Sequence, residues 1–281
     1  MNACIKSHSA YGRCLYAENG VIELYIPLDF GIRIGHLSFI GEKNLFFVQP
    51  QDMQLFMTEK GWRIRGGHRL WIAPESEKVY SPDNAPIDYQ IVGENILLTQ
   101  KEDNELGLVK RISLRLQGNR VYLTHKITNV KKEPFVGSLW AITVMDKGGI
   151  EYIKLNRRDG GFDALHSIAL WDYTNLGDER ASYEKDSITL KSLDLDAKYK
   201  IGVRHPVTPI SYELDGVIFK KYYQVQKDKS YPDSGVSYET FMSNYMTEME
   251  SLSPLVSLGE GESAEHEEIW ELERSQKKEK V

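Results

Sequence analysis

The sequence has few cysteines and no long apolar run, and each absence excludes a class of protein. Only Cys4 and Cys14 occur among its 281 residues, which excludes a disulfide framework and predicts two free thiols. No segment approaches the run of about 20 apolar residues that a transmembrane helix needs. The N-terminal residues lack the unbroken apolar stretch of a secretory signal peptide. We therefore expect a cytoplasmic protein without a membrane partner.

The sequence also lacks the signatures of nucleic-acid binding and of several enzyme classes. The formal net charge is −6 and no basic block is present, so nucleic acid and anionic membranes are not expected partners. Walker A, GxGxxG, GxSxG and HExxH motifs are absent. The histidines are scattered without metal-ligand spacing. We expect no cofactor and no metal.

Alternation of apolar and polar residues recurs along the chain and predicts β-strands. In residues 107–116, Leu108, Ile112 and Leu114 share one parity and charged residues occupy the other. Short turn signals separate such runs, and long helical periodicity is absent. The pattern predicts an all-β protein built as a large antiparallel sandwich. The other predicted strands are residues 21–26, 120–128, 217–223 and 266–272.

Neither a Pro/Ser-rich linker nor an internal repeat divides the chain. We expect one domain over residues 1–273, followed by a charged and disordered tail at 274–281. Residues 172–187 lack alternation and predict a long loop. Such a loop either serves a ligand site or is a solvated excursion.

The segment WRIRGGHRLWIAPE, residues 62–75, gathers three arginines and His68 around Gly66 and Gly67. Glycine pairs permit close backbone approach, and guanidinium groups present forked donors to anions and hydroxyls. The segment therefore predicts a ligand site. The alternative is that the arginines pair with nearby carboxylates and the glycines form a bulge.

A second segment, YMTEMESLSPLVSL at residues 245–258, carries two acidic residues. If it begins as a strand, Glu248 and Glu250 point to one face together with Met246. Two carboxylates at this spacing repel, and one pKa rises toward the range of a general base. The alternative is a solvent-facing strand. In the predicted strand 217–223, Lys220 and Lys221 point to opposite faces.

Seven segments, in this order, resemble the galactose-mutarotase-like (aldose 1-epimerase-like) superfamily, and most closely a bacterial branch of it. The resemblance implies a β-supersandwich of antiparallel sheets with a site for a small-molecule carbohydrate on a concave sheet face. The segments are IRGGHRLWIAPE (64–75), VYSPDNAP (79–86), LWAITVMDKGG (139–149), IALWDYTNLGDER (168–180), IFKKYY (218–223), YPDSG (231–235) and EMESLSPLVSLGEGESAEHEEIWEL (248–272).

The resemblance also implies site residues. In the more distant hexose-6-phosphate mutarotases a catalytic glutamate precedes Ser-Pro at a spacing that falls on Glu248, with Glu250 as the alternative. Their Arg-Gly-Gly segment resembles the one that begins at Arg65. The substrate-binding residues expected on this basis are Arg65, Trp71, Asn84, Trp140, Lys221 and Glu250.

One position departs from the family pattern, because Trp140 stands where mutarotases place a histidine. Mutarotation needs a base for the anomeric hydroxyl and an acid for the ring oxygen. His68 is the nearby histidine that could supply the acid. Tryptophan suits a sugar-stacking floor better than proton transfer.

Two functions follow. The first is an aldose or sugar-phosphate 1-epimerase with Glu248 as general base and His68 as acid. The second is a non-catalytic sugar-binding or sensing protein. Glycoside cleavage fits less well, because Glu248 and Glu250 lie on one strand and do not flank a bond. The arginine cluster predicts an anionic ligand, unless those arginines neutralise Glu75 and the two strand glutamates.

Overall fold

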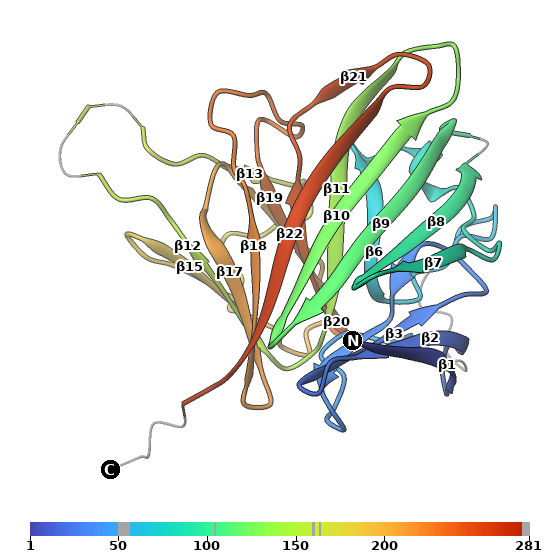
Figure 1. The fold of residues 1–281 in the computed structure, drawn as a ribbon. Helices are drawn as coiled ribbons and strands as arrows, with labels where there is room; N and C mark the ends of the chain where they lie inside the picture. Colours follow the sequence, from blue (N-terminus) through green and yellow to red (C-terminus); the bar gives the residue numbers. More distant parts are fainter. Residues whose placement is uncertain (50–56, 104, 159–160, 163, 277–281) are drawn as a thin grey trace.

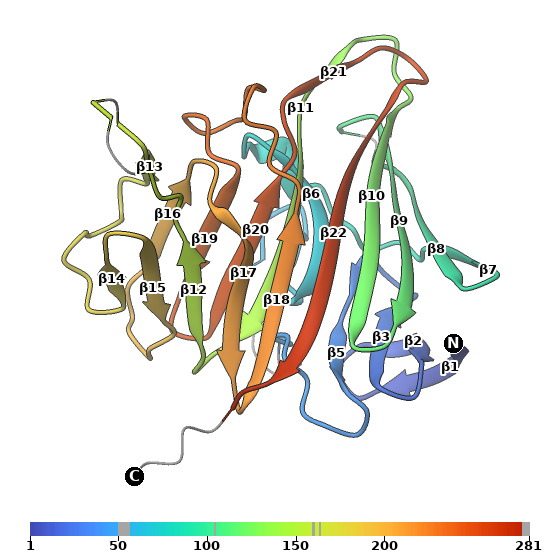
Figure 2. The same ribbon diagram turned by 60° about the vertical axis from the view of Figure 1, so that its left-hand side comes forward.

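Strands dominate the computed structural model, which describes residues 1–49, 57–103, 105–158, 161–162 and 164–276. They assemble into three antiparallel sheets (Figures 1 and 2). Helical structure in the described residues is limited to the short 3-10 helix η1 (Glu77–Tyr80). In this part of the chain, no helix has both the length and the apolarity to cross a membrane.

The two larger sheets contain ten and eight strands. The ten-stranded sheet has the order β14 (Ala181–Tyr183), β15 (Ser187–Lys191), β12 (Ile150–Lys154), β17 (Val207–Leu214), β18 (Val217–Tyr223), β22 (Ser263–Arg274), β10 (Arg120–Asn129), β9 (Leu108–Gln117), β8 (Asn95–Asp103) and β7 (Asp88–Val92). The eight-stranded sheet has the order β13 (Ile168–Leu170), β16 (Tyr199–Val203), β19 (Tyr238–Met242), β20 (Met246–Leu252), β11 (Phe135–Asp146), β6 (Gly67–Ala73) and β4 (Arg33–Ile34), and β21 (Val256–Leu258) pairs with β11. The third sheet consists of β1 (Asn2–His8), β2 (Gly12–Glu18), β3 (Ile22–Pro27) and β5 (His36–Phe39).

The all-β prediction is confirmed, and the five strands predicted from alternation coincide with β3, β9, β10, β18 and β22. In β9, Leu108, Ile112 and Leu114 are buried while alternate positions are more exposed. Leu114 lies opposite Leu123 of β10, so the apolar faces of neighbouring strands coincide. A one-residue slip would turn every one of these side chains to the other face.

The ten-stranded and eight-stranded sheets pack face to face. Trp270 of β22 contacts Phe46 and, across the interface, His68 of β6, with ring centroids 5.7 Å and 4.6 Å apart. Every residue of β6 and β20 is buried, so both faces of these strands are covered. One face lies in the core between the sheets. The opposite, outer face of the eight-stranded sheet is therefore also covered by other parts of the chain. The candidate site lies on this outer face.

Two expectations about irregular segments need adjustment. β22 continues to Arg274, whose guanidinium donates a 2.8 Å hydrogen bond to Glu42, so the strand extends one residue into the predicted tail. Residues 277–281 lie outside the described residues. Within the predicted loop 172–187, Ala181–Tyr183 form β14, so the loop prediction is wrong there. Both thiols are free, with Cys4 exposed and Cys14 buried.

Candidate functional site

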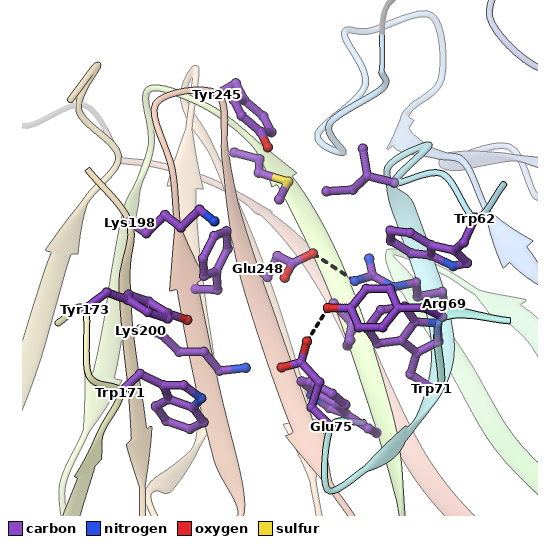
Figure 3. A pocket seen from close by; sticks show the side chains of 16 residues that line it. Trp62, Arg69, Trp71, Glu75, Trp171, Tyr173, Lys198, Lys200, Tyr245 and Glu248 are labelled. Carbon is purple, nitrogen blue, oxygen red and sulfur yellow. Dashed lines mark hydrogen bonds and ion pairs between the residues drawn. The ribbon is translucent and has the colours of Figure 1, made fainter. Parts of the chain in front are cut away.

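A cavity of about 360 Å³ opens on the outer face of the eight-stranded sheet (Figure 3). Its floor comes from β6, β11 and β20, one side from β16 and β19, and the rest from loops. The lining residues are Trp62, Ile64, Arg69, Trp71, Glu75, Tyr80, Trp140, Ile142, Trp171, Tyr173, Lys198, Lys200, Phe241, Tyr245, Met246 and Glu248. We call this cavity the sheet pocket.

Strand parity decides which side chains reach the sheet pocket. In β6, Arg69 and Trp71 point into it, whereas His68 points to the core between the sheets. In β20, Met246 and Glu248 line the pocket on the parity expected from the sequence. Successive residues of a strand alternate between faces, so one register fixes the whole set.

Tryptophan is concentrated at the sheet pocket. Four of the five tryptophans of the chain line it, namely Trp62, Trp71, Trp140 and Trp171. The Trp62 and Trp71 rings lie 5.0 Å apart, and those of Trp71 and Trp140 lie 5.7 Å apart. Such rings present large, rigid apolar faces at low entropic cost. The pocket therefore has a continuous aromatic wall.

Glu248 and Arg69 form a buried ion pair in this wall. Arg69 Nη2 donates to Glu248 Oε1 at 3.1 Å, and the guanidinium lies 4.4 Å from the Trp71 ring (Figure 3). In the described part of the chain, Arg69 Nε and Nη1 are buried without an acceptor. A buried donor left unpaired costs stability. An oxygen-rich ligand or ordered water would satisfy these donors.

Three further polar side chains of the pocket lie outside the strands, Glu75 and Tyr173 in loops and Tyr80 at the end of η1. Tyr80 donates its hydroxyl to Glu75, and burial together with this bond raises the pKa of Tyr80. Burial raises the pKa of Tyr173 to about 12. Thr174 donates to the carbonyl of Lys200 and accepts a 3.1 Å hydrogen bond from its N–H, which fixes the loop that carries Trp171 and Tyr173.

Lys200 lies at one side of the pocket and links it to buried carboxylates. Its Nζ is 2.8 Å from Glu239 and 3.2 Å from Glu250. The same atom lies 4.6 Å from the Trp140 ring and 4.7 Å from the Trp171 ring. Trp140 Nε1 donates to Glu250 at 2.9 Å. This arrangement fixes two pocket tryptophans against one cation.

The structure brings only some of the sequence-predicted site residues together. Trp71, Trp140 and Glu248 line the pocket, and Glu250 lies behind Trp140. Arg65 and Asn84 bond each other at 2.6 Å but are not among the lining residues. Arg65 instead stacks over Phe30 at 3.9 Å.

His68 and Lys221 do not reach the pocket, so their expected positions need correction. His68 is fully buried between the sheets, where burial lowers its pKa well below the ordinary value. Lys221 is also fully buried there, 3.0 Å from Glu268. The reason is parity, because each side chain lies on the core face of its strand. Among the residues that the structure describes, no histidine lines the sheet pocket.

The histidine cluster between the sheets is the one place where the described residues bring together ligand atoms for a metal. His68, His125 and Glu268 each place one such atom within 4.8 Å of the others. His125 Nδ1 donates to the His266 carbonyl at 3.0 Å, because a carbonyl only accepts. Burial lowers the pKa of both clustered histidines, so both are neutral.

This hydrogen-bond chain fixes the tautomers of the two histidines. His125 Nε2 must then accept from His68 Nε2–H at 2.7 Å, and His68 Nδ1 accepts from the Thr143 hydroxyl at 2.9 Å. The two Nε2 atoms therefore bond each other. Lys221 already supplies the positive charge beside Glu268.

Some pocket residues were missed in the sequence. Arg69 belongs to the arginine cluster but was not distinguished from Arg65. Tyr173 lies in the segment interpreted as a loop, and Trp171 directly precedes it. Aromatic residues at the start of that loop were the available signal. Lys200 had none, because its partners Glu239 and Glu250 are distant in the sequence.

No family model and no curated protein matches the sequence. Solved structures do match. A galactose mutarotase-like protein from Lactobacillus casei is 9% identical, with a TM-score of 0.62 over 92% of this chain and 100% of that one. A candidate mutarotase from Salmonella typhimurium is 9% identical, with a TM-score of 0.60 over 93% and 90%. A candidate aldose 1-epimerase from Escherichia coli is 11% identical, with a TM-score of 0.58 over 97% and 100%. At this identity the likeness concerns the fold, and the chain has the galactose mutarotase-like fold.

Proposed function

We propose that the sheet pocket binds a carbohydrate and that the protein acts as a sugar-binding protein. The observation that carries the proposal is the combination of four tryptophans with Arg69, Lys200 and Glu248 in one cavity. Its volume, about 360 Å³, suits a small ligand. Aromatic rings offer flat faces to the C–H surface of a sugar. Charged groups at the edges offer hydrogen bonds to its hydroxyls.

The absence of a pocket histidine favours binding over chemistry. Trp140 occupies the position where the family resemblance places the histidine, and its Nε1–H is already donated to Glu250. Glu248 is held in an ion pair by Arg69. The pocket thus has a base but lacks the usual acid among its described residues.

Aldose 1-epimerase activity is the second candidate, and the position of Glu248 favours it. A carboxylate in the pocket could remove the anomeric proton, while Tyr173 is a hydroxyl in the same cavity that could donate one. Burial raises the pKa of Tyr173 to about 12, so this hydroxyl is protonated at neutral pH but is a weak acid.

One experiment separates the two candidates. Binding of neutral hexoses, hexose 6-phosphates and uronates is measured by calorimetry, and anomer exchange by two-dimensional NMR, for wild type and Glu248→Gln. For a binding protein we expect saturable binding in both and no exchange above buffer. Exchange in wild type that Glu248→Gln abolishes would establish the epimerase instead. Absence of binding to the whole panel would refute a carbohydrate site.

Truncation of Trp171 tests the aromatic wall without opening a core cavity, since this residue is only partly buried. Trp171→Ala is expected to weaken sugar binding about 10-fold or more, because buried aromatic anchors dominate binding energy. Tyr89→Ala, which removes an exposed ring on β7 away from the pocket, is the matched control. Equal affinities for both variants and wild type would contradict a role for the wall.

A further inference from the structure

Three buried charged side chains meet behind the wall of the sheet pocket. Lys200 of β16, Glu239 of β19 and Glu250 of β20 are 4%, 1% and 0% exposed. The ammonium lies 2.8 Å from Glu239 Oε2 and 3.2 Å from Glu250 Oε2. One cation therefore serves two carboxyl groups. With both ionised, the cluster would carry a net negative charge out of contact with water.

The strand register places the two carboxyl groups against each other. Glu239 and Glu250 are direct partners in the antiparallel pairing of β19 and β20. Direct partners point to the same face with their Cβ atoms about 5 Å apart. Two like charges in such a pair are destabilising. The pairing thus favours a state in which one of the two is neutral.

The hydrogen bonds show where a proton is needed. Glu239 Oε1 and Glu250 Oε1 are both buried and have no donor in the part of the chain that the structure describes. Their Oε2 atoms are satisfied by Lys200, and Glu250 Oε2 also accepts from Trp140. A proton on either Oε1 removes one negative charge and one unpaired buried acceptor. One proton therefore relieves the charge and part of the hydrogen-bond deficit.

We propose that Glu239 and Glu250 hold one proton between them at neutral pH, and that this proton keeps Lys200 and Trp140 in place at the sheet pocket. The two glutamates are positioning residues, because neither lines the cavity. Lys200 and Trp140 do line it. Loss of the shared proton adds a buried negative charge beside the Trp140 indole and the Lys200 ammonium, and changes the geometry of the aromatic wall.

Charged groups from several elements surround the pair. On the pocket side, Glu248 opposes ionisation of Glu250, and its partner Arg69 favours it. Behind the sheet, burial raises the pKa of Glu151 on β12, and the charge of Glu250 adds to this effect. Burial lowers the pKa of Lys221 on β18, although Glu268 and Glu250 oppose it. Asp233 in the loop before β19 adds negative charge near Glu239. Apart from Lys200, no cation contacts the pair directly among the described residues.

The electrostatics of the pair agree with this proposal. Burial raises the pKa of Glu250, although Lys200 opposes this, and burial likewise raises the pKa of Glu239 well above its ordinary value. The pKa of Lys200 is itself raised, because Glu250 and Glu239 outweigh the effect of its burial. Lys200 thus stays charged, and the titration belongs to the carboxyl pair as a unit.

Carboxyl NMR on protein with ¹³C-labelled glutamate side chains tests the shared proton without any ligand. In wild type we expect two carboxyl titrations in the neutral range, far above the ordinary value of about 4. One belongs to Glu151, whose pKa burial raises to about 7, and the other belongs to the Glu239–Glu250 pair. The indole N–H resonance of Trp140, assigned with Trp140→Phe, should shift with the same midpoint. Glu239→Gln supplies a permanent N–H donor in place of the proton. The carboxyl titration of the pair and the shift of the Trp140 indole should therefore vanish, while the titration of Glu151 remains.

Glu250→Gln should have the same effect, and Glu267→Gln, which removes an exposed carboxylate of β22, should leave both titrations unchanged. The proposal is overturned if no carboxyl other than Glu151 titrates in the neutral range, or if that second neutral titration persists in both Gln variants. It is also overturned if the Trp140 indole resonance does not follow the carboxyl titration. Because no sugar is used, these outcomes are independent of whether the pocket binds a carbohydrate.

The same proton predicts a pH dependence of stability. A carboxyl pKa that is higher in the folded than in the unfolded chain gives stability that is fully present below about pH 4. That stability is lost as the pH rises through the folded pKa. We therefore expect the Tm of wild type to fall between pH 5 and pH 8 more steeply than the Tm of Glu239→Gln. Parallel pH profiles for the two proteins would contradict the shared proton.

Discussion

Lys221→Met is expected to lower the free energy of unfolding by about 3–5 kcal/mol, because it removes one partner of a fully buried ion pair. Lys221 Nζ lies 3.0 Å from Glu268 Oε1 and donates to the carbonyls of Ala141 and Met249 at 3.0 Å and 2.9 Å. The ammonium thereby uses all three of its donors. Methionine fills a similar volume but leaves a buried carboxylate and two carbonyls without their partner.

Lys220→Met is the matched control, since it removes the same side chain from the neighbouring position. Lys220 points to the opposite face of β18 and pairs with Glu273, whose side chain is 40% exposed. Pairs of this kind contribute about 0–1 kcal/mol. Denaturant unfolding of both variants against wild type measures the difference. Comparable losses for Lys220→Met and Lys221→Met would contradict the importance of the buried charge.

A double variant separates loss of the pair from loss of packing. Glu268 stays ionised in the core, its pKa held below the ordinary range, because the charge of Lys221 outweighs the effect of burial. Replacing both partners with apolar residues removes the unpaired charge along with the pair. Lys221→Met with Glu268→Leu should therefore recover part of the stability lost in Lys221→Met. A loss larger than the sum of the single losses would show that packing dominates.

The contrast between Lys220 and Lys221 shows what alternation could predict. The sequence placed them on opposite faces, and the structure agrees. It likewise placed Glu248 and Glu250 on one face of β20. The two-residue alternation of a strand predicts which of its side chains share a face. Which face meets the second sheet and which meets a ligand depends on partners that are remote in the sequence, and so Lys221 was expected at the site.

The error for His68 has a more local cause. Arg65, Gly66 and Gly67 all have positive φ values, 40°, 79° and 71°, so the chain turns sharply just before β6. A Cβ on Gly66 would lie 2.1 Å from the Phe47 carbonyl oxygen, and one on Gly67 would lie 2.5 Å from that of Ile34. Only glycine fits there. The alternation of side chains between the two faces of a strand does not continue through such a turn. The sequence pattern therefore could not tell whether Arg65 and Arg69 lie on the same face.

Because of this turn, Arg65 and Arg69 occupy different environments, and their substitution should affect sugar binding differently. Arg69→Met is expected to weaken binding of the sugar found in the screen by about 2–3 kcal/mol, or roughly 30–150-fold. Its guanidinium lines the pocket and has two donors that lack acceptors among the described residues. Arg65→Met should change affinity less than about 3-fold, because Arg65 bonds Asn84 outside the cavity lining.

Arg69→Met also leaves Glu248 without its partner, so the double variant with Glu248→Gln is needed to assign the loss. If Arg69 bonds the ligand, the double variant binds as weakly as Arg69→Met. If the loss reflects only an unpaired carboxylate, the double variant recovers the affinity of Glu248→Gln.

Comparing a neutral hexose with its 6-phosphate at low and moderate salt tests the expected anionic preference. The Arg69–Glu248 pair at 3.1 Å leaves little net charge at this position, so a neutral sugar should bind with little dependence on salt. A strong preference for the phosphate that moderate salt weakens would instead identify an exposed cation of the pocket, such as Lys198, as the anion-binding group.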